Sequence, residues 1–465
     1  MSFNSNTSVK SRAIGLLVAT GLAQMIVVID YMAIEVAMPD MAKNFGVRPV
    51  DLQWVITGYI LSFSAVLGIA GPLGDRFGRK RLLLTGIVIF GAVSVWVGFT
   101  NSATMAIVAR IVQGLGGGLL FPLATAVVSN GVKKENVPRT LSLLTGIATI
   151  GMAIGPVIGG VFTEELSWRW VFFLNAPIAA LAFIAVLMLS NESRDPEATG
   201  RIDVVGIMLL MLGLSLLAVG IDRIPHWPLL WWLNMACGGV AILVLFVMVE
   251  LRLRSPMVDL RLLGNRTFAG YLGGGTLSNC CWVVLIFGTT LYLQMVKKDD
   301  ALSTGLIFLF MSASVAAASF TGPVIQRHMG TRNLVLLAIV IQIVACIMFW
   351  IDDAKPWLVI ALFVAGFGCS WAWAMTQAGG IVTVPPNKVG LAAGSMLTVM
   401  IMMGNMALVV SATLIQAFSG PSGNNDQPGI TATYILGLGV VVAGFLVIFF
   451  VVPREPKAAA SELNR

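Results

Sequence analysis

Residues 71–81 read Gly71-Pro72-Leu73-Gly74-Asp75-Arg76-Phe77-Gly78-Arg79-Lys80-Arg81, a charged and glycine-rich segment between two long apolar runs. Charged side chains this crowded are excluded from lipid, and the flanking runs, of roughly 18 to 20 apolar residues each, are long enough to span a bilayer. The segment therefore predicts a tight polar loop at which the chain leaves a membrane, turns sharply and returns.

The composition of the whole chain agrees with this interpretation. Of 465 residues 57% are hydrophobic and 11% are charged, and the mean hydropathy is +0.90. Soluble globular domains are far less apolar. The first apolar run, residues 13–38, is too long for a secretory signal and has no small-residue cleavage site, so we expect a transmembrane helix there. The chain is thus expected to be an all-α polytopic membrane protein.

Apolar runs of about 17 or more residues predict fourteen transmembrane helices. We expect them near residues 13–38, 51–71, 82–100, 103–128, 140–162, 171–189, 204–221, 228–249, 268–293, 303–323, 333–351, 357–377, 391–417 and 432–452. Of the 29 Lys and Arg residues, 21 lie on the termini and the loops after even-numbered helices, and 7 lie on the opposite loops. This asymmetry predicts that both termini are cytoplasmic. The net charge of +7 reflects this topology, and no nucleic-acid partner is expected.

Polar stretches at residues 191–203 and 250–266 divide the chain into six, two and six helices. We predict an N-terminal six-helix bundle over 1–190, a linker with two additional helices over 191–266, and a C-terminal six-helix bundle with a cytoplasmic tail over 267–465. Residues 322–332 echo the charged segment at 71–81, with one extra residue and with Gln326 in the place of Asp75. A repeat at equivalent helices favours two duplicated bundles around a central cavity.

Ionisable residues inside the apolar runs mark the first candidate site. Asp30 and Glu35 lie in the first run and Arg110 lies in the fourth. Such residues usually mark ion or substrate pathways. At 1.5 Å per residue, Asp30 and Arg110 both lie roughly 10 to 14 Å below the outer surface, so they could meet. A carboxylate beside a fixed cation can exchange a proton as its surroundings change, which predicts proton coupling. The alternative is a permanent structural salt bridge.

Glu35 lies five residues after Asp30, about 140° around the helix, so the two side chains do not share a face. We include Glu35 among the proton-coupling residues. The alternative is a solvated carboxylate near the membrane interface.

The fifth apolar run contains glycines four residues apart, together with a proline. This spacing lets helices approach closely and predicts a kinked helix packed tightly on a neighbour. The residues concerned are Gly151, Gly155, Pro156, Gly159 and Gly160. The fourth run adds a charge and a glycine face in Arg110-Ile111-Val112-Gln113-Gly114-Leu115-Gly116-Gly117-Gly118.

With these motifs the chain resembles the major facilitator superfamily, and specifically its fourteen-helix drug:proton antiporters, the EmrB/QacA-type exporters. Residues 71–81 resemble the signature between helices two and three, 110–118 the proton-transfer motif, and 151–160 the antiporter motif. Residues 30–39 and 168–177 also resemble family motifs. The resemblance implies the major facilitator fold and conformational gating by Gly71, Asp75, Arg76, Gly78, Arg79 and Lys80.

Two departures from the family pattern are visible. Met32 and Glu35 stand where the first-helix motif usually has Thr and Asn, which affects the detail of coupling. The tenth run, 303–323, has no acidic residue, whereas some relatives that export multivalent cations carry one there. Dicationic substrates are therefore not expected.

We expect the substrate cavity between the two bundles near mid-membrane. Polar and aromatic side chains within helices are the natural contacts for amphipathic ligands, although membrane aromatics also serve as packing residues and interface anchors. The candidate substrate-binding residues are Gln24, Tyr59, Gln113, Asn279, Trp282, Tyr292, Gln294, Trp371, Trp373, Gln377 and Asn405.

The predicted function is export of an amphipathic, cationic or neutral compound in exchange for protons, by alternating access. A dedicated exporter of one metabolite or antibiotic, or a proton-linked importer on the same fold, is the alternative. An enzyme is not expected, because the Gly420-Pro421-Ser422-Gly423 sequence lies in an outer loop and His226 and His328 lie in loops on opposite faces. No cofactor, metal site or ATP motif is expected, and protons are the coupling ion. We expect a monomer in the bacterial inner membrane whose partners are its lipophilic or cationic substrate, protons and lipid.

Overall fold

The computed structural model describes residues 3–133, 136–194, 203–253, 256, 258–351, 355–385, 388–419 and 426–453. Within these ranges, fourteen helices are long and apolar enough to cross a membrane, which confirms the predicted number. They are α1 (Phe3–Phe45), α2 (Trp54–Phe77), α3 (Arg79–Gly98), α4 (Ala103–Asn130), α5 (Val137–Glu165), α6 (Arg169–Leu189), α7 (Val204–Asp222), α8 (Leu229–Arg252), α9 (Arg266–Leu291), α10 (Ala301–Met329), α11 (Thr331–Ile351), α12 (Lys355–Val382), α13 (Val389–Phe418) and α14 (Gln427–Val451). Short helical turns are η1 (Pro49–Gln53), η3 (Leu260–Gly264) and the π-turn η4 (Tyr292–Val296).

The chain forms two compact units, Met1–Ile207 and Met208–Arg465, and the boundary falls inside α7. The expected division into six, two and six helices, with limits at 190 and 266, stays a prediction.

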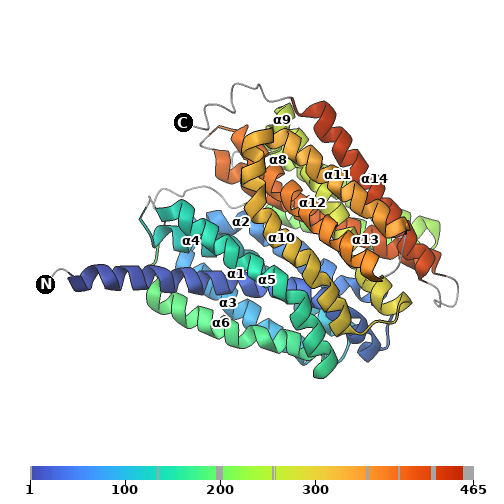
Figure 1. Ribbon diagram of the computed structural model, residues 1–465, viewed down its shortest axis with the longest axis horizontal. Coiled ribbons are helices and arrows are strands. Elements are labelled where there is room, and N and C mark those ends of the chain that lie inside the picture. Colours follow the sequence, from blue (N-terminus) through green and yellow to red (C-terminus); the bar gives the residue numbers. More distant parts are fainter. Residues whose placement is uncertain are drawn as a thin grey trace. The chain divides into compact units, whose positions relative to one another are not determined.

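Helix α1 lies at the centre of the first unit (Figure 1), where it packs against α4, α5 and α6. Helix α4 also packs against α2 and α3, and α3 packs against α6. Glycines on two faces of α4 permit these approaches. A Cβ at Gly118 would lie 2.5 Å from the Phe63 carbonyl oxygen of α2, and one at Gly116 would lie 2.8 Å from the Phe90 nitrogen of α3. The glycine face noted in the sequence therefore serves helix packing.

The second unit repeats these pairings. Helix α9 packs against α12, α13 and α14, α12 also packs against α10 and α11, and α11 packs against α14. Each pairing corresponds to one in the first unit displaced by eight helices, for example α2 with α4 and α10 with α12. The packing therefore supports the duplication expected from the sequence.

The sharp turn expected in segment 71–81 is confirmed, but it is shorter than the expected helix ends at 71 and 82 implied. Helix α2 continues to Phe77, α3 begins at Arg79, and Gly78 alone separates them, with a φ of +107°. Because that conformation is strained for residues with a Cβ, glycine serves the corner. In the second unit Gly330, with a φ of +77°, separates α10 from α11 in the same way.

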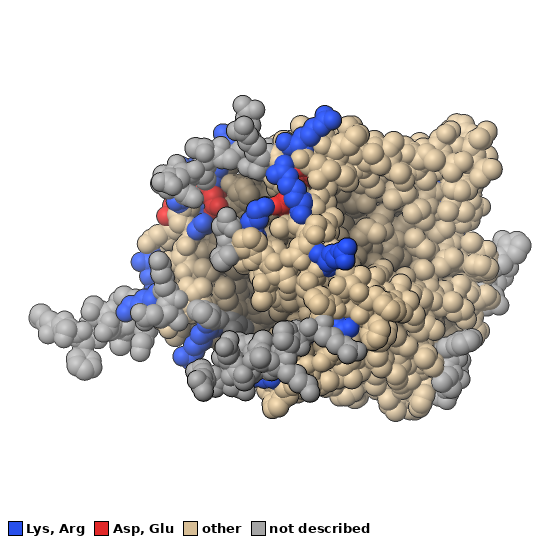
Figure 2. All heavy atoms as spheres, turned by 90° about the horizontal axis from the view of Figure 1, so that it is seen from above, with Lys and Arg blue, Asp and Glu red and all other residues tan. Residues whose placement is uncertain are grey.

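The two additional helices, α7 and α8, pack on one another through small residues. A Cβ at Gly239 of α8 would lie 2.6 Å from the Leu217 nitrogen of α7, and one at Gly220 would lie 2.7 Å from the Ala236 nitrogen of α8. Much of the outer surface of α8 is apolar and exposed, as at Leu230. On the face shown in Figure 2, a broad surface carries no charged side chain. Both features suit a protein surrounded by lipid.

Four of the five cysteines are buried in the second unit, and Sγ of Cys281 lies 3.5 Å from Sγ of Cys346. Cys237 on α8 is exposed. It lies on an apolar surface, where a thiol is tolerated without burial in protein.

Candidate functional site

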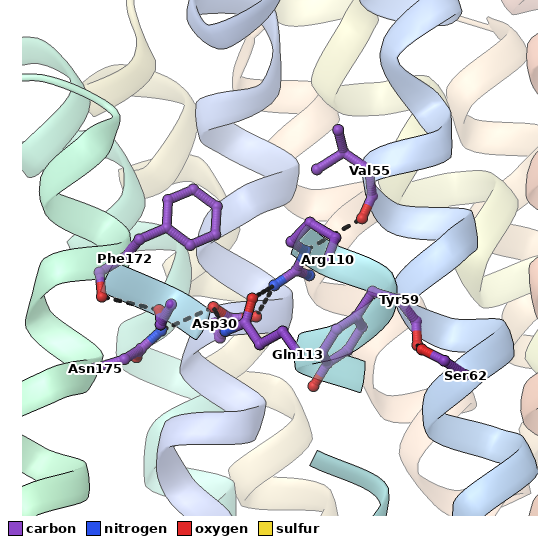
Figure 3. A network of polar contacts seen from close by, with 9 residues as sticks. Asp30, Val55, Tyr59, Ser62, Arg110, Gln113, Phe172 and Asn175 are labelled. Carbon is purple, nitrogen blue, oxygen red and sulfur yellow. Dashed lines mark hydrogen bonds and ion pairs between the residues drawn. The ribbon is translucent and has the colours of Figure 1, made fainter. Parts of the chain in front are cut away.

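Asp30 of α1 and Arg110 of α4 meet in the interior of the first unit (Figure 3). An Arg110 Nη1 hydrogen bond to Asp30 Oδ2 joins them, and both side chains have an exposed fraction of 0%. The depth argument from the sequence is thus confirmed as a contact. Since a buried charge is costly unless it is paired and hydrogen-bonded, each of these residues accounts for the presence of the other.

Two amide side chains complete the surroundings of the carboxylate. Gln113 Nε2, one turn after Arg110, donates to Asp30 Oδ1 at 3.1 Å, and Asn175 Nδ2 of α6 donates to the same oxygen at 2.8 Å. The Gln113 amide is held from its other end, because its Oε1 accepts from Arg110 Nη1 at 2.8 Å. Every polar neighbour in this set is a donor, which matches an ionised carboxylate.

Asn175 is itself held by α3. Its Nδ2 also donates to Ser94 Oγ at 3.0 Å, and the Ser94 hydroxyl donates to the Phe172 carbonyl oxygen at 2.9 Å. Asp30 is thereby connected to Arg110 on α4 and Asn175 on α6 (Figure 3), and through Asn175 to Ser94 on α3.

The Arg110 guanidinium has further partners on α2. Its Nε donates to the Val55 carbonyl oxygen at 3.2 Å, and its Cζ lies 4.0 Å from the ring centroid of Tyr59. A desolvated cation over an aromatic face is stabilised by the ring quadrupole. The aromatic ring and the carboxylate therefore both stabilise the positive charge of Arg110.

Glu35 is buried, with an exposed fraction of 2%, so the alternative of a solvated carboxylate is wrong. It lies apart from the Asp30 contacts, as expected from its place on the helix. Its polar neighbour is Tyr31, one turn earlier on α1, and its oxygens make no hydrogen bond of normal geometry with the described residues. The position of Glu35 near the end of the predicted helix did not indicate that this part of α1 is buried.

The gating residues around Gly78 form a second group of contacts. Arg79 Nε donates to Asp75 Oδ1 at 2.8 Å, so an ion pair spans the corner between α2 and α3. Lys80 Nζ donates to the carbonyl oxygens of Leu187 and Ser190 at the end of α6, both at 2.7 Å. Cations near the last carbonyls of a helix interact favourably with its dipole. Lys80 thus joins the start of α3 to the end of α6.

Glu192, just after α6, caps the start of α3. Its carboxylate accepts from the backbone nitrogens of Lys80 and Arg81 at 3.1 and 3.2 Å, as an anion at a helix N-terminus does. A Cβ at Gly78 would lie 2.7 Å from this carboxylate. Gly71 has open space around its Cβ position, and Arg76 is exposed and lies over the Phe77 ring.

Three residues of these sites were not assigned from the sequence. Asn175 lies within the motif at 168–177 but received no role, although an amide in an apolar run was a usable signal. Ser94 carries no distinctive pattern, because hydroxyls are common within membrane helices. Glu192 was taken as part of a polar linker, and its capping role depends on α3 and α6 lying side by side.

The antiporter-motif glycines pack α5 on α1. Cβ atoms at Gly151 and Gly155 would lie 2.7 Å from Met25 Cγ and Met32 Cβ, and one at Gly159 would lie 2.6 Å from the Ala33 carbonyl oxygen. Pro156 and Gly160 are also buried. The motif therefore holds α5 against the helix that carries Asp30.

The eleven candidate substrate residues fall into three groups. Tyr59 and Gln113 belong to the Arg110 contacts, and Gln24, Asn279 and Trp371 donate to backbone carbonyls of Phe121, Met400 and Ala318 at 2.8 to 2.9 Å. The remaining six are buried or half-buried side chains of the second unit: Trp282, Tyr292, Gln294, Trp373, Gln377 and Asn405. Their role in binding stays a prediction. Within the described ranges, no group of three or more His, Cys, Asp or Glu side chains is placed to share a metal ion.

Comparisons with known proteins agree with this architecture. The family model described as the Major Facilitator Superfamily matches residues 20–351 and again 300–465. The drug efflux pump JefA of Mycobacterium tuberculosis is 29% identical over 413 residues, which cover 86% of this chain and 80% of JefA. The cephamycin export protein CmcT of Amycolatopsis lactamdurans is 31% identical over 98% of this chain and 95% of its own length.

Among solved structures, the nucleoside transporter NupG has a TM-score of 0.68 at 14% identity, over 94% of this chain and 99% of NupG. This likeness concerns the fold alone. The matching family model, the relatives and the repeated helix pairings lead to one conclusion: the chain belongs to the Major Facilitator Superfamily, as a multi-pass membrane protein.

Proposed function

We propose that this protein exports amphipathic, cationic or neutral compounds in exchange for protons by alternating access. The similarity to a drug efflux pump and to a cephamycin export protein supports export of a small molecule. The observation that carries the coupling ion is the fully buried Asp30 beside Arg110, since an intramembrane carboxylate in a polar network is a natural proton-binding group.

In the proposed cycle, Asp30 takes up a proton and loses its negative charge. Its pairing with Arg110 then weakens, which favours the conformation that releases substrate outward. Glu35 is a second carboxylate available to the coupling step. The contacts at Gly78 are proposed to control closure of the cytoplasmic side. The protein needs no cofactor in this scheme and works as a monomer in a bacterial inner membrane, with both termini in the cytoplasm.

A dedicated exporter of one compound is the second candidate. It is favoured by the similarity to a cephamycin export protein along 98% of the chain. The two candidates differ in breadth: a multidrug pump transports chemically unrelated lipophilic compounds, whereas a dedicated exporter responds to one scaffold.

The test uses purified protein in proteoliposomes that contain a pH-sensitive dye, under an imposed pH gradient. A panel of lipophilic monovalent cations, neutral drugs and β-lactams is added to wild type, Asp30→Asn and Asp51→Asn. Asp51 is the matched control, since it is an exposed carboxylate paired with Arg48 on the surface. We expect substrate-dependent proton release with wild type and Asp51→Asn, and at least a tenfold loss with Asp30→Asn.

Two results would contradict the proposal. If no compound moves protons with wild type although compounds bind, proton antiport is wrong. If Asp30→Asn keeps the wild-type rate, coupling through Asp30 is wrong. Release by several unrelated scaffolds favours the multidrug function, and release by one scaffold favours the dedicated exporter.

A further inference from the structure

Among the groups around Asp30, Asn175 uses only one end of its amide. Both hydrogens of Nδ2 are engaged, by Asp30 Oδ1 at 2.8 Å and Ser94 Oγ at 3.0 Å. Its Oδ1 is buried and has no hydrogen-bond partner among the described residues. A buried acceptor without a partner is costly, so this oxygen is free to accept a hydrogen bond if the amide rotates.

Protonation of Asp30 changes what its neighbours must supply. An ionised carboxylate accepts hydrogen bonds only, whereas a carboxylic acid must also donate one. Arg110 can only donate, and Gln113 Oε1 already accepts from Arg110 Nη1 at 2.8 Å. The unused Oδ1 of Asn175 is an acceptor that the protonated form could use once the amide rotates.

The Ser94 hydroxyl can serve both orientations of the Asn175 amide. With Nδ2 toward Asp30, as in Figure 3, Ser94 Oγ accepts from Asn175 and donates to the Phe172 carbonyl oxygen at 2.9 Å. With the amide rotated by half a turn, Oδ1 would face both Asp30 and Ser94. The hydroxyl could then rotate and donate to it, since a serine is both a donor and an acceptor.

We infer that Asn175 is the positioning residue that reads the protonation state of Asp30, by reversing the direction of the Ser94–Asn175–Asp30 hydrogen-bond chain. The proton bound by Asp30 comes from water and stays on the carboxyl group, so the reversal needs no further proton and no change of covalent bonds. Because Ser94 lies on α3 and Asn175 on α6, the reversal links the state of Asp30 on α1 to two other helices. This inference rests on the proposed proton coupling.

Other ionisable groups face Asp30 from the helices that pack around it. They are Arg110 of α4 and Tyr59 of α2, while Tyr31 and Glu35 are its neighbours on α1. The variants described next leave all four in place, so that a change in pH dependence can be attributed to the amide.

The first experiment compares the pH dependence of substrate-driven proton release by wild type and Asn175→Leu in proteoliposomes. Leucine has the same branched shape and number of heavy atoms, and it offers neither donor nor acceptor. A hydrogen bond to the charged form is stronger than one to the neutral acid, so its loss favours the protonated form. We expect the pH of half-maximal release to rise by about one unit. Ser94→Ala should shift it less, in the same direction, and Ser94→Thr should restore the wild-type value.

Ser314→Ala is the matched control. Ser314 is a buried serine of α10 whose hydroxyl donates to the Met311 carbonyl oxygen of its own helix at 2.7 Å. Removing it deletes a buried hydroxyl without touching the Asp30 contacts. We expect its pH profile to match that of wild type.

Infrared difference spectra between low and high pH supply a readout that a merely structural role would not change. The carboxyl C=O band that Asp30→Asn removes should shift in frequency in Asn175→Leu, because the acid loses the acceptor of its proton. An unchanged band and an unchanged pH profile, in a variant that still binds substrate, would overturn the inference. Absence of substrate-driven proton release in wild type would instead contradict the proposed function. Failure of the inference and failure of the proposed function are therefore distinguishable.

Discussion

At the scale of single residues, the interior of the first unit is organised around one compensated pair of charges. Asp30 and Arg110 are completely buried and form an ion pair with one another. Most of their other contacts are hydrogen bonds with Gln113, Asn175 and the Val55 carbonyl oxygen, together with the Tyr59 ring over Arg110. A buried ion pair adds little net stability, because desolvation offsets its attraction. Removing one partner is different, since it leaves a charge that neither water nor protein satisfies.

Arg110→Met should therefore destabilise the protein by about 3 to 5 kcal/mol, and adding Asp30→Asn should recover part of that loss. The measurement is a double-mutant cycle by thermal or denaturant unfolding in detergent micelles. Arg48 and Asp51 provide the control cycle, since they form an exposed pair at 3.1 Å whose coupling should be about 0 to 1 kcal/mol. Equal coupling energies for the two pairs would contradict this, because they would show that removing Arg110 does not leave Asp30 as a buried, unpaired charge.

At the scale of helices, the approach of α5 to α1 depends on glycines that leave no room for a side chain. Gly159→Val should cost about 1 to 3 kcal/mol of stability, because the new Cβ would lie 2.6 Å from the Ala33 carbonyl oxygen. Gly146→Val is the control on the same helix, since nothing lies within 4 Å of its Cβ position. Its unfolding midpoint should stay near that of wild type. An equal loss of stability in both variants would show that valine destabilises the helix itself, and not its packing on α1.

These helices also show what the sequence can and cannot predict. All fourteen were predictable, because about twenty apolar residues in succession leave few alternatives. Their ends were not, since polar residues such as Asp75 and Arg76 extend α2 beyond the apolar run. Depth indicated that Asp30 and Arg110 could meet, whereas the partner helix of α5 and the roles of Ser94, Asn175 and Glu192 depend on which helices pack together.

At the scale of the whole molecule, two units with the same helix pairings differ in the chemistry of their interiors. The first unit encloses the ion pair of Asp30 and Arg110. In the second unit, described contacts between helices include neutral pairs such as Gln342 with Ser278 at 2.7 Å and Tyr434 with Thr289 at 3.3 Å. The corners at Gly78 and Gly330 differ in the same way. An ion pair of Asp75 and Arg79 spans the first corner, and a neutral hydrogen bond from Gln326 to Thr331, at 3.0 Å, spans the second. Duplication preserved the packing, and the candidate coupling residues Asp30, Glu35 and Arg110 lie in the first unit.

The orientation of the molecule in the membrane is the remaining prediction at this scale. With 21 of 29 basic residues on the termini and the loops after even-numbered helices, the positive-inside rule places those segments in the cytoplasm. A green fluorescent protein fused after Arg465 should therefore fluoresce in a bacterial host. Alkaline phosphatase, which is active only when exported, should be inactive when fused after Lys133, between α4 and α5, and active when fused after Leu166, between α5 and α6. The two phosphatase fusions differ by one helix and control for expression. The opposite pattern would mean that the protein has the opposite orientation in the membrane. The direction in which Asp30 is proposed to carry protons would then also be opposite.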